Sequence, residues 1–155
     1  MSFIRGLAVP VLSLLWLQPM AAFGQESGYL SAVALIVSDL DRSTAYYGEV
    51  FGFENARTIK TETLRENILR LPGERGAALV LVQPSAPQAN TDRSARLVFR
   101  VPDPAAVVEK ARGAGSEVVR EAAPLAAVGG QMGMVRDPDG YTIELLQMPA
   151  PSGTE

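Results

Sequence analysis

The sequence of this 155-residue chain repeats itself, and the repeat limits the folds it can adopt. Residues 31–84 read as a short apolar strand, a helix and three strand-like segments, and residues 95–147 read in the same order. Four pairs of positions are separated by the same number of residues, with no gap: Ala32 with Arg96, Gly76 with Gly140, Val80 with Glu144, and Gln83 with Gln147. Chance agreement at four separated positions is improbable, so we expect two halves with the same fold.

Residue types at the ends of the expected helices support their placement. The first helix is expected to start near Asp41 and to stop at Gly52, because glycine tolerates the left-handed conformation that ends many helices. The second is expected to open at Asp103, whose carboxylate can cap backbone N–H groups, with Pro104 in the first helical position. Each half therefore reads as β-α-β-β-β.

Two glycine-containing turns precede the last strands of the halves. The strings PGERG and DPDGY are typical of tight reversals, and Gly76 and Gly140 are expected to be their left-handed residues. Asp137 and Asp139 are expected to serve the second turn, because short acidic side chains accept hydrogen bonds from nearby backbone N–H groups.

One β-α-β-β-β unit alone would leave an apolar sheet face exposed, so the two units must combine. The predicted fold class is α+β, with two modules pairing into a cupped, mostly antiparallel sheet. The single domain is expected to span residues 30–148, with modules at 30–84 and 95–148 and a linker at 85–94 that is rich in Pro, Ser, Asn and Asp. Residues 149–155 are expected to form a disordered tail.

The residue types that are missing exclude several kinds of chemistry. The chain has no histidine and no cysteine, so it offers neither an imidazole base nor a thiolate nucleophile, and only oxygen ligands for a metal. Its 17 acidic and 14 basic residues, for a net charge of −3, form no basic stripe that could follow a phosphate backbone. We therefore expect no nucleic-acid partner.

The N-terminal residues have the order of a secretory signal. Arg5 precedes an apolar run over residues 6–17, and small residues follow near Gly24. A signal peptide is predicted over residues 1–24, with a short segment at 25–29 before the domain. The protein is thus expected to be periplasmic or secreted, without membrane association after cleavage; an uncleaved membrane anchor is the alternative.

Two longer strings carry a family resemblance. VSDLDRSTAYYGEVFGF and RDPDGYTIELLQ, near the start and end of the doubled chain, closely resemble the glyoxalase/bleomycin-resistance/dioxygenase superfamily, also called the vicinal-oxygen-chelate superfamily. The resemblance covers residues 30–148. Members of that superfamily include isomerases, lyases, ring-cleaving dioxygenases and antibiotic-binding proteins. The resemblance therefore implies one specific fold but several possible functions.

The resemblance also points to four positions where a metal would be held. Metal-dependent members take ligands, typically histidine or glutamate, from the first and last strands of each half. The matching residues here are Ala32, Val80, Arg96 and Glu144. Only Glu144 has an oxygen to offer, and one carboxylate does not hold a catalytic metal. We therefore expect neither a bound metal nor another cofactor.

If those four positions face the cup, the alternation of side chains along each strand predicts which other residues face it. The expected ligand-binding residues are Ala32, Val80, Arg96, Val98, Arg100, Thr142 and Glu144. An apolar wall opposite a pair of arginines suits an amphiphilic or anionic organic molecule. Alternatively, Arg96 and Glu144 form a salt bridge that only fills the place of a metal.

The sequence leaves three functions open. The first is an exported, metal-free protein that binds a small organic molecule in the cup, between its halves or at a homodimer interface. The second is a glyoxalase-like lyase or isomerase, or a dioxygenase-related enzyme, with Glu144 as its catalytic acid or base; Arg96 opposes this role because a neighbouring cation favours the charged carboxylate. The third is an interaction subunit whose cavity is filled by its own side chains.

Overall fold

The computed structural model describes residues 30–88, 92–126 and 129–149. The predicted signal peptide, the segment that follows it and the predicted tail beyond Pro149 lie outside the described residues, and they stay predictions. Within the described part, no helix is long and apolar enough to span a membrane.

The first module contains one helix and four strands. They are β1 (Ala32–Ile36), α1 (Leu40–Phe51), β2 (Glu54–Lys60), β3 (Leu64–Arg70) and β4 (Ala78–Pro84). Helix α1 begins slightly before the expected residue, because the Asp39 side chain accepts hydrogen bonds from the N–H groups of Asp41 and Arg42 at 3.1 and 3.0 Å. It ends as expected at Gly52, which has a φ of 79°.

The second module repeats this order. It comprises β5 (Arg96–Arg100), α2 (Pro104–Gly113), β6 (Val118–Leu125), β7 (Gly130–Arg136) and β8 (Thr142–Gln147). The predictions for Asp103 as the cap of α2, for Pro104 in its first turn and for a left-handed Gly140 are confirmed. The prediction for Gly76 is wrong. The turn closes between the Leu71 carbonyl and the Glu74 N–H, so the left-handed residue is Gly73 at its third position.

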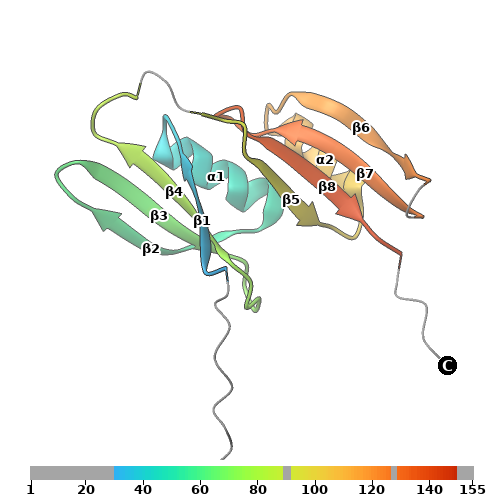
Figure 1. Cartoon of the computed structure of the whole chain (residues 1–155), viewed down its shortest axis with the longest axis horizontal. Coiled ribbons are helices and arrows are strands. Elements are labelled where there is room, and N and C mark those ends of the chain that lie inside the picture. The colour runs from blue at the N-terminus through green and yellow to red at the C-terminus, as the bar shows by residue number, and fades with distance from the viewer. Residues whose placement is uncertain (1–29, 89–91, 127–128, 150–155) are drawn as a thin grey trace, which may run out of the picture.

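The strands form two four-stranded sheets, in the orders β1-β4-β3-β2 and β5-β8-β7-β6. In each sheet the first pair is parallel and the other two are antiparallel. The α+β class and the two β-α-β-β-β modules are therefore confirmed (Figure 1). Within one chain, however, no hydrogen-bonded ladder between described residues joins the two sheets into one.

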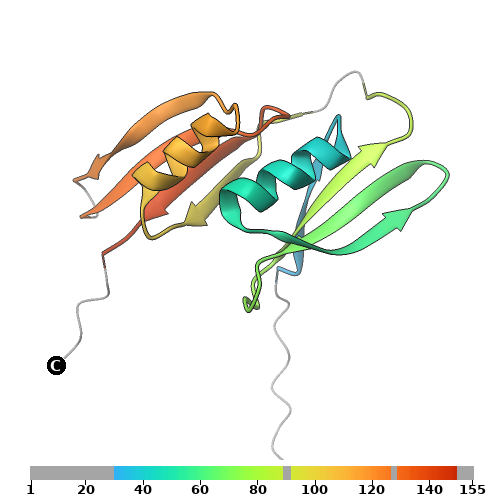
Figure 2. The same cartoon turned by 180° about the vertical axis from the view of Figure 1, so that it is seen from behind.

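Both helices lie on the same side of the molecule, as the view from behind shows (Figure 2). Each sheet turns buried aliphatic side chains towards its helix, among them Leu35, Leu81, Ile143 and Leu145. The helices also contact one another, and the ring of Phe51 packs against that of Phe99 with 4.7 Å between centroids. The opposite face of each sheet carries no helix, and we call these two surfaces the open faces (Figures 1 and 2).

A turn of the second module holds the two modules together. Asp139 accepts hydrogen bonds from the N–H and the hydroxyl of Ser38, both at 2.7 Å, and from the Ser43 hydroxyl at 2.5 Å. Arg42 adds an ion pair at 3.1 Å, and the Asp139 side chain has no exposed surface. All of these partners belong to the start of α1 or the residues just before it, so Asp139 does more than serve its own turn.

Two neighbours of Asp139 also reach the first module. Asp137 accepts a hydrogen bond from the Tyr141 N–H within the turn, as expected, and another from the Tyr47 hydroxyl on α1 at 2.8 Å. The Tyr141 hydroxyl accepts a hydrogen bond from the N–H of Ile36 and donates one to the carbonyl of Ile36, each at 3.2 Å. We call residues 137–141 the inter-module turn, because its side chains bind both α1 and the outer edge of β1.

The two buried carboxylates of this turn differ in their acidity. Burial raises the pKa of Asp137, and hydrogen bonds from Tyr47 and the backbone only partly offset that effect. Burial would also raise the pKa of Asp139, but hydrogen bonds from Ser43 and Ser38 outweigh it, and the pKa lies below its ordinary value. The folded state therefore favours an ionised Asp139.

Replacing Asp139 should weaken the junction between the modules. We expect Asp139→Asn to lower the free energy of unfolding by about 2 kcal/mol, because charge-assisted hydrogen bonds to a buried group are lost. Urea unfolding followed by circular dichroism measures the change. The matched control is Asp41→Asn, whose exposed pair with Arg65 should contribute less than about 1 kcal/mol. Equal effects of the two substitutions would contradict the role given to Asp139.

The effect of Asp139→Asn should depend on pH. Because the pKa of Asp139 is lowered on folding, its contribution to stability is present above its unfolded pKa of about 3.9 and is lost as the pH falls through the folded value. The difference in unfolding free energy between wild type and Asp139→Asn should thus shrink below about pH 4. Asp137 is present in both proteins, but its pKa is raised by burial and also by the charge of Asp139, so the difference reports Asp139 together with its effect on Asp137. A difference that is constant from neutral to acidic pH would refute this assignment.

Candidate ligand-binding site

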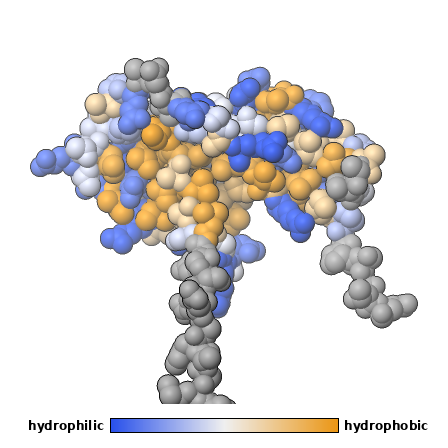
Figure 3. All heavy atoms as spheres, in the orientation of Figure 1, coloured by the Kyte–Doolittle hydropathy of each residue, from blue (hydrophilic) through white to orange (hydrophobic). Residues whose placement is uncertain are grey.

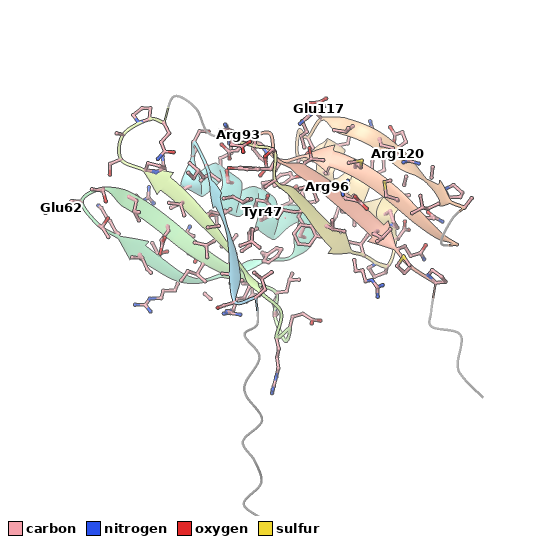
Figure 4. All side chains as sticks on the ribbon, viewed as in Figure 1. Tyr47, Glu62, Arg93, Arg96, Glu117 and Arg120 are labelled. Carbon is pink, nitrogen blue, oxygen red and sulfur yellow. The ribbon has the colours of Figure 1, made fainter. Side chains whose placement is uncertain are left out.

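The open face of the second module carries an ion pair. Nη1 of Arg96, on β5, lies 3.2 Å from Oε2 of Glu144, on β8. The Arg96 side chain is 57% exposed, whereas that of Glu144 is 15% exposed. Figure 4 labels Arg96 on the strand that borders the first module. The carboxylate is thus largely covered, while the guanidinium remains accessible to a ligand.

The register of the parallel strands explains this pair. Arg96 lies beside Thr142, and Val98 lies beside Glu144. Alternate side chains of a strand share a face, so Arg96, Val98 and Glu144 all point away from α2. The long arginine side chain spans the one-row offset along the sheet and reaches the carboxylate.

The structure divides the predicted site residues between the two open faces. Arg96, Val98, Arg100, Thr142 and Glu144 lie on the second sheet, and Ala32 and Val80 lie on the first. Ala34, opposite Val80, continues the apolar surface of the first sheet.

One chain does not gather Ala32, Val80, Arg96 and Glu144 into a common pocket. Arg96 borders a cavity of about 300 Å³ between β1 and β5, and Val33, Leu97 and Phe99 are among its other lining residues. Ala32, Val80 and Glu144 do not line this cavity. The expected convergence fails within a chain because the modules pack through their helices and the inter-module turn, and not by pairing β1 with β5.

Sequence reasoning missed part of the open face around Glu144. Met134 lies directly beside Glu144 on β7, and Arg120 lies beside Met134 on β6. The alternation of side chains along residues 130–136 was the sequence signal that could have placed Met134 on the open face. The register between β6 and β7 is irregular on both sides of Arg120. The direction of the Arg120 side chain therefore cannot be obtained by counting alternate residues along the sequence.

Comparison with known proteins places this chain in a family. The model of the Glyoxalase/Bleomycin resistance protein/Dioxygenase superfamily matches residues 29–145. The chain belongs to this superfamily. The resemblance carried by the two sequence strings is thereby confirmed.

Several relatives in the superfamily are lactoylglutathione lyases. A probable lactoylglutathione lyase of Vibrio parahaemolyticus is 31% identical over 128 residues, which cover 79% of this chain and 92% of that protein. A lactoylglutathione lyase of Arabidopsis thaliana is 32% identical over 116 residues, or 72% of this chain. This chain spans only 41% of the length of the plant protein.

Solved structures of the superfamily share the fold. A glyoxylase/bleomycin resistance protein/dioxygenase domain from Frankia sp. superposes with a TM-score of 0.67 at 25% identity, covering 81% of this chain and 94% of that one. Glyoxalase I of Leishmania major, described as trypanothione-dependent, gives a TM-score of 0.66 at 26% identity, covering 78% and 87% of the two chains.

The residues of this member do not fit the metal that the superfamily resemblance implies. The four equivalent positions hold the methyl groups of Ala32 and Val80, the guanidinium of Arg96 and one carboxylate, Glu144, which already faces Arg96. Among the described residues, no three His, Cys, Asp or Glu side chains are grouped closely enough to hold a metal. A guanidinium repels a cation and cannot be deprotonated to bind one.

The Arg96–Glu144 pair should contribute little to stability if its main role is to meet a ligand. We expect Arg96→Ala to change the free energy of unfolding by less than about 1 kcal/mol, because a half-exposed ion pair is screened by water. Urea unfolding measures this, with Arg112→Ala, which removes exposed ion pairs to Glu109 and Glu121, as the control. A loss of more than about 2 kcal/mol would show that the pair is a structural element in place of a metal site.

Proposed function

We propose that this protein binds a small organic molecule, amphiphilic or anionic, on its open faces without the help of a metal. One observation carries the proposal: the accessible guanidinium of Arg96, backed by Glu144, stands on a sheet face that also exposes apolar side chains. Among the described residues, the Arg96 side chain pairs with Glu144 alone, so its remaining N–H groups are available to a carboxylate or a phosphate.

The apolar part of the ligand has two surfaces to contact. Val98, next to Arg96 on the same face, is 52% exposed. The open face of the first module is built from small and aliphatic residues on β1 and β4, and Figure 3 shows apolar surface over that region. Exposed apolar surface of this kind in a folded protein is typical of a binding site.

A second copy of the chain is the proposed partner that completes the cup. Neither β1 nor β5 has a strand partner on its outer side among the described residues. Val37 and Val101 donate their N–H groups inward, to β4 and β8, so the backbone groups of Ala34 and Val98 point outward. Pairing β1 of one copy with β5 of another would set the apolar face beside the charged one.

Export is part of the proposal and rests on the sequence. Arg5, the apolar run after it and the small residues near Gly24 support a cleaved signal peptide, and the protein would then act in a periplasm or outside the cell. The absence of cysteine means that the fold needs no disulfide in such a compartment.

A glyoxalase-like lyase is the second candidate, because relatives about 30% identical are named lactoylglutathione lyases. Glu144 would then have to move a proton although its carboxylate already pairs with the guanidinium of Arg96 at 3.2 Å. The donor set for a metal is also missing from the described residues. An interaction subunit with a filled cavity is less well supported, since a hollow of about 300 Å³ remains between β1 and β5.

Ligand binding should depend on Arg96 and not on metal. A thermal-shift screen of small aliphatic and aromatic carboxylates, followed by calorimetry, should find ligands whose affinity is unchanged by a chelator. Arg96→Ala should weaken binding at least tenfold, because a bidentate guanidinium contact is lost. Glu144→Gln should also alter the affinity, because the guanidinium loses the carboxylate that orients it.

Arg75→Ala, on the loop before β4, is the matched control and should bind as the wild type does. Unchanged affinity in both Arg96→Ala and Glu144→Gln, for every ligand found, would refute the proposed function. Near-stoichiometric nickel, zinc or iron in the purified protein, with lactoylglutathione lyase activity lost on chelation, would establish the second candidate instead.

A further inference from the structure

The register of the second sheet arranges its open face in rows that cross all four strands. One row contains Val98, Glu144, Met134 and Arg120. The next row contains Arg100, Leu146, Met132 and Ala123. Partners in a register share a face, so these side chains form one surface. Its two central strands carry Leu146, Met132 and Met134 together with the largely covered carboxylate of Glu144, and a guanidinium stands on each of its two outer strands.

Two of the arginines on this surface have no counter-ion in the part of the chain that the structure describes. Arg96 pairs with Glu144, and Arg136 pairs with Glu117 at 3.1 Å. No hydrogen bond or ion pair joins the side chain of Arg100 or Arg120 to any other described residue, and both residues are exposed. Arg100 is on β5 and Arg120 on β6, at opposite sides of the sheet, with Arg120 labelled in Figure 4. Three strand spacings, roughly 14 Å, separate the two strands.

The surface between these two arginines suits an apolar chain. Met132, Met134 and Leu146 lie between Arg100 and Arg120 on the central strands, and none of them is fully buried. Methionine side chains adapt their shape to an irregular apolar partner. At the Arg100 end, Leu146 and Met148 line an open hollow of about 510 Å³ with Arg100. The surface therefore has room for a bound molecule at that end.

We infer that the second module binds an elongated organic molecule with an acidic group at each end, one held by Arg100 and the other by Arg120, across the methionine surface. This inference rests on the proposed function and names the class of ligand. Each guanidinium can hold a carboxylate through two parallel hydrogen bonds, and the apolar middle of the ligand covers Met132, Met134 and Leu146. A molecule with a single acidic group can engage only one of the two arginines.

Calorimetry with dodecanedioic acid, dodecanoic acid and dodecanediol tests the inference, since an extended chain of about twelve carbons approaches the roughly 14 Å between β5 and β6. We expect the diacid to bind about tenfold more tightly than the monoacid, and the diol to bind weakest. Arg100→Gln and Arg120→Gln should each weaken binding of the diacid about tenfold. Circular dichroism melting curves of both variants confirm that they fold, which exposed substitutions should permit.

Arg75→Gln, an exposed arginine away from this surface, is the control and should leave all three affinities unchanged. Equal affinity for the diacid and the monoacid, or diacid binding that survives both arginine substitutions, would overturn the inference. If other carboxylates bind through Arg96 while the diacid does not bind, the proposed function stands and the inference fails. If no carboxylate binds the wild type at all, both fail.

Discussion

The carboxylate of Asp139 connects the two halves of this protein, and the shape of the molecule depends on it. The group has no exposed surface, and burying a charge without partners would be costly. Four hydrogen-bond donors from Ser38, Ser43 and Arg42 compensate for that cost, and each lies in the first module. The charge of Asp139 therefore has its hydrogen-bond donors only when the modules are docked. The same hydrogen bonds that offset the cost of burying this charge also set the relative position of the two modules.

This docking has consequences for both sheets. The helices come together at the junction, and the ring of Phe51 on α1 packs against that of Phe99 on β5. The Tyr141 hydroxyl occupies the outward backbone groups of Ile36, at one end of β1. The rest of the outer edge of β1 and that of β5 stay without a strand partner among the described residues, and the open faces stay free of helices. The modules are thus held together on the helix side, and the open faces take no part in joining them.

Two modules with one backbone plan present chemically different surfaces. Ala32 and Val80 on the first sheet occupy the positions that Arg96 and Glu144 occupy on the second. The first surface is therefore apolar over β1 and β4, whereas the second carries guanidinium groups, of which those of Arg100 and Arg120 have no counter-ion among the described residues. A superfamily framework that positions metal ligands in other members here positions a permanent cation, which attracts anions directly. The fold constrains where the site lies, whereas a few side chains constrain what it can bind.

Much of the fold could be predicted from the sequence because the relevant signals are local. The caps at Asp103 and Pro104 and the end of α1 at Gly52 depend on backbone conformations that nearby residues dictate. Gly76 was misjudged because a turn is defined by which backbone groups close it, and PGERG permits more than one choice. Arg96 and Glu144 were expected as neighbours because strands of one module pair in a register that the repeat already indicates.

The sequence by itself determined the doubled β-α-β-β-β plan, the faces of most strands and the shortage of metal ligands, because periodicity, capping and composition are properties of the chain alone. Only the tertiary structure decided how the modules meet. Asp139 is read from the sequence as a turn residue, and nothing near it in the chain reveals that its partners lie about a hundred positions earlier. Whether the four equivalent positions share one pocket was decided by that distant contact, because a buried charge binds the donors that three-dimensional packing brings to it.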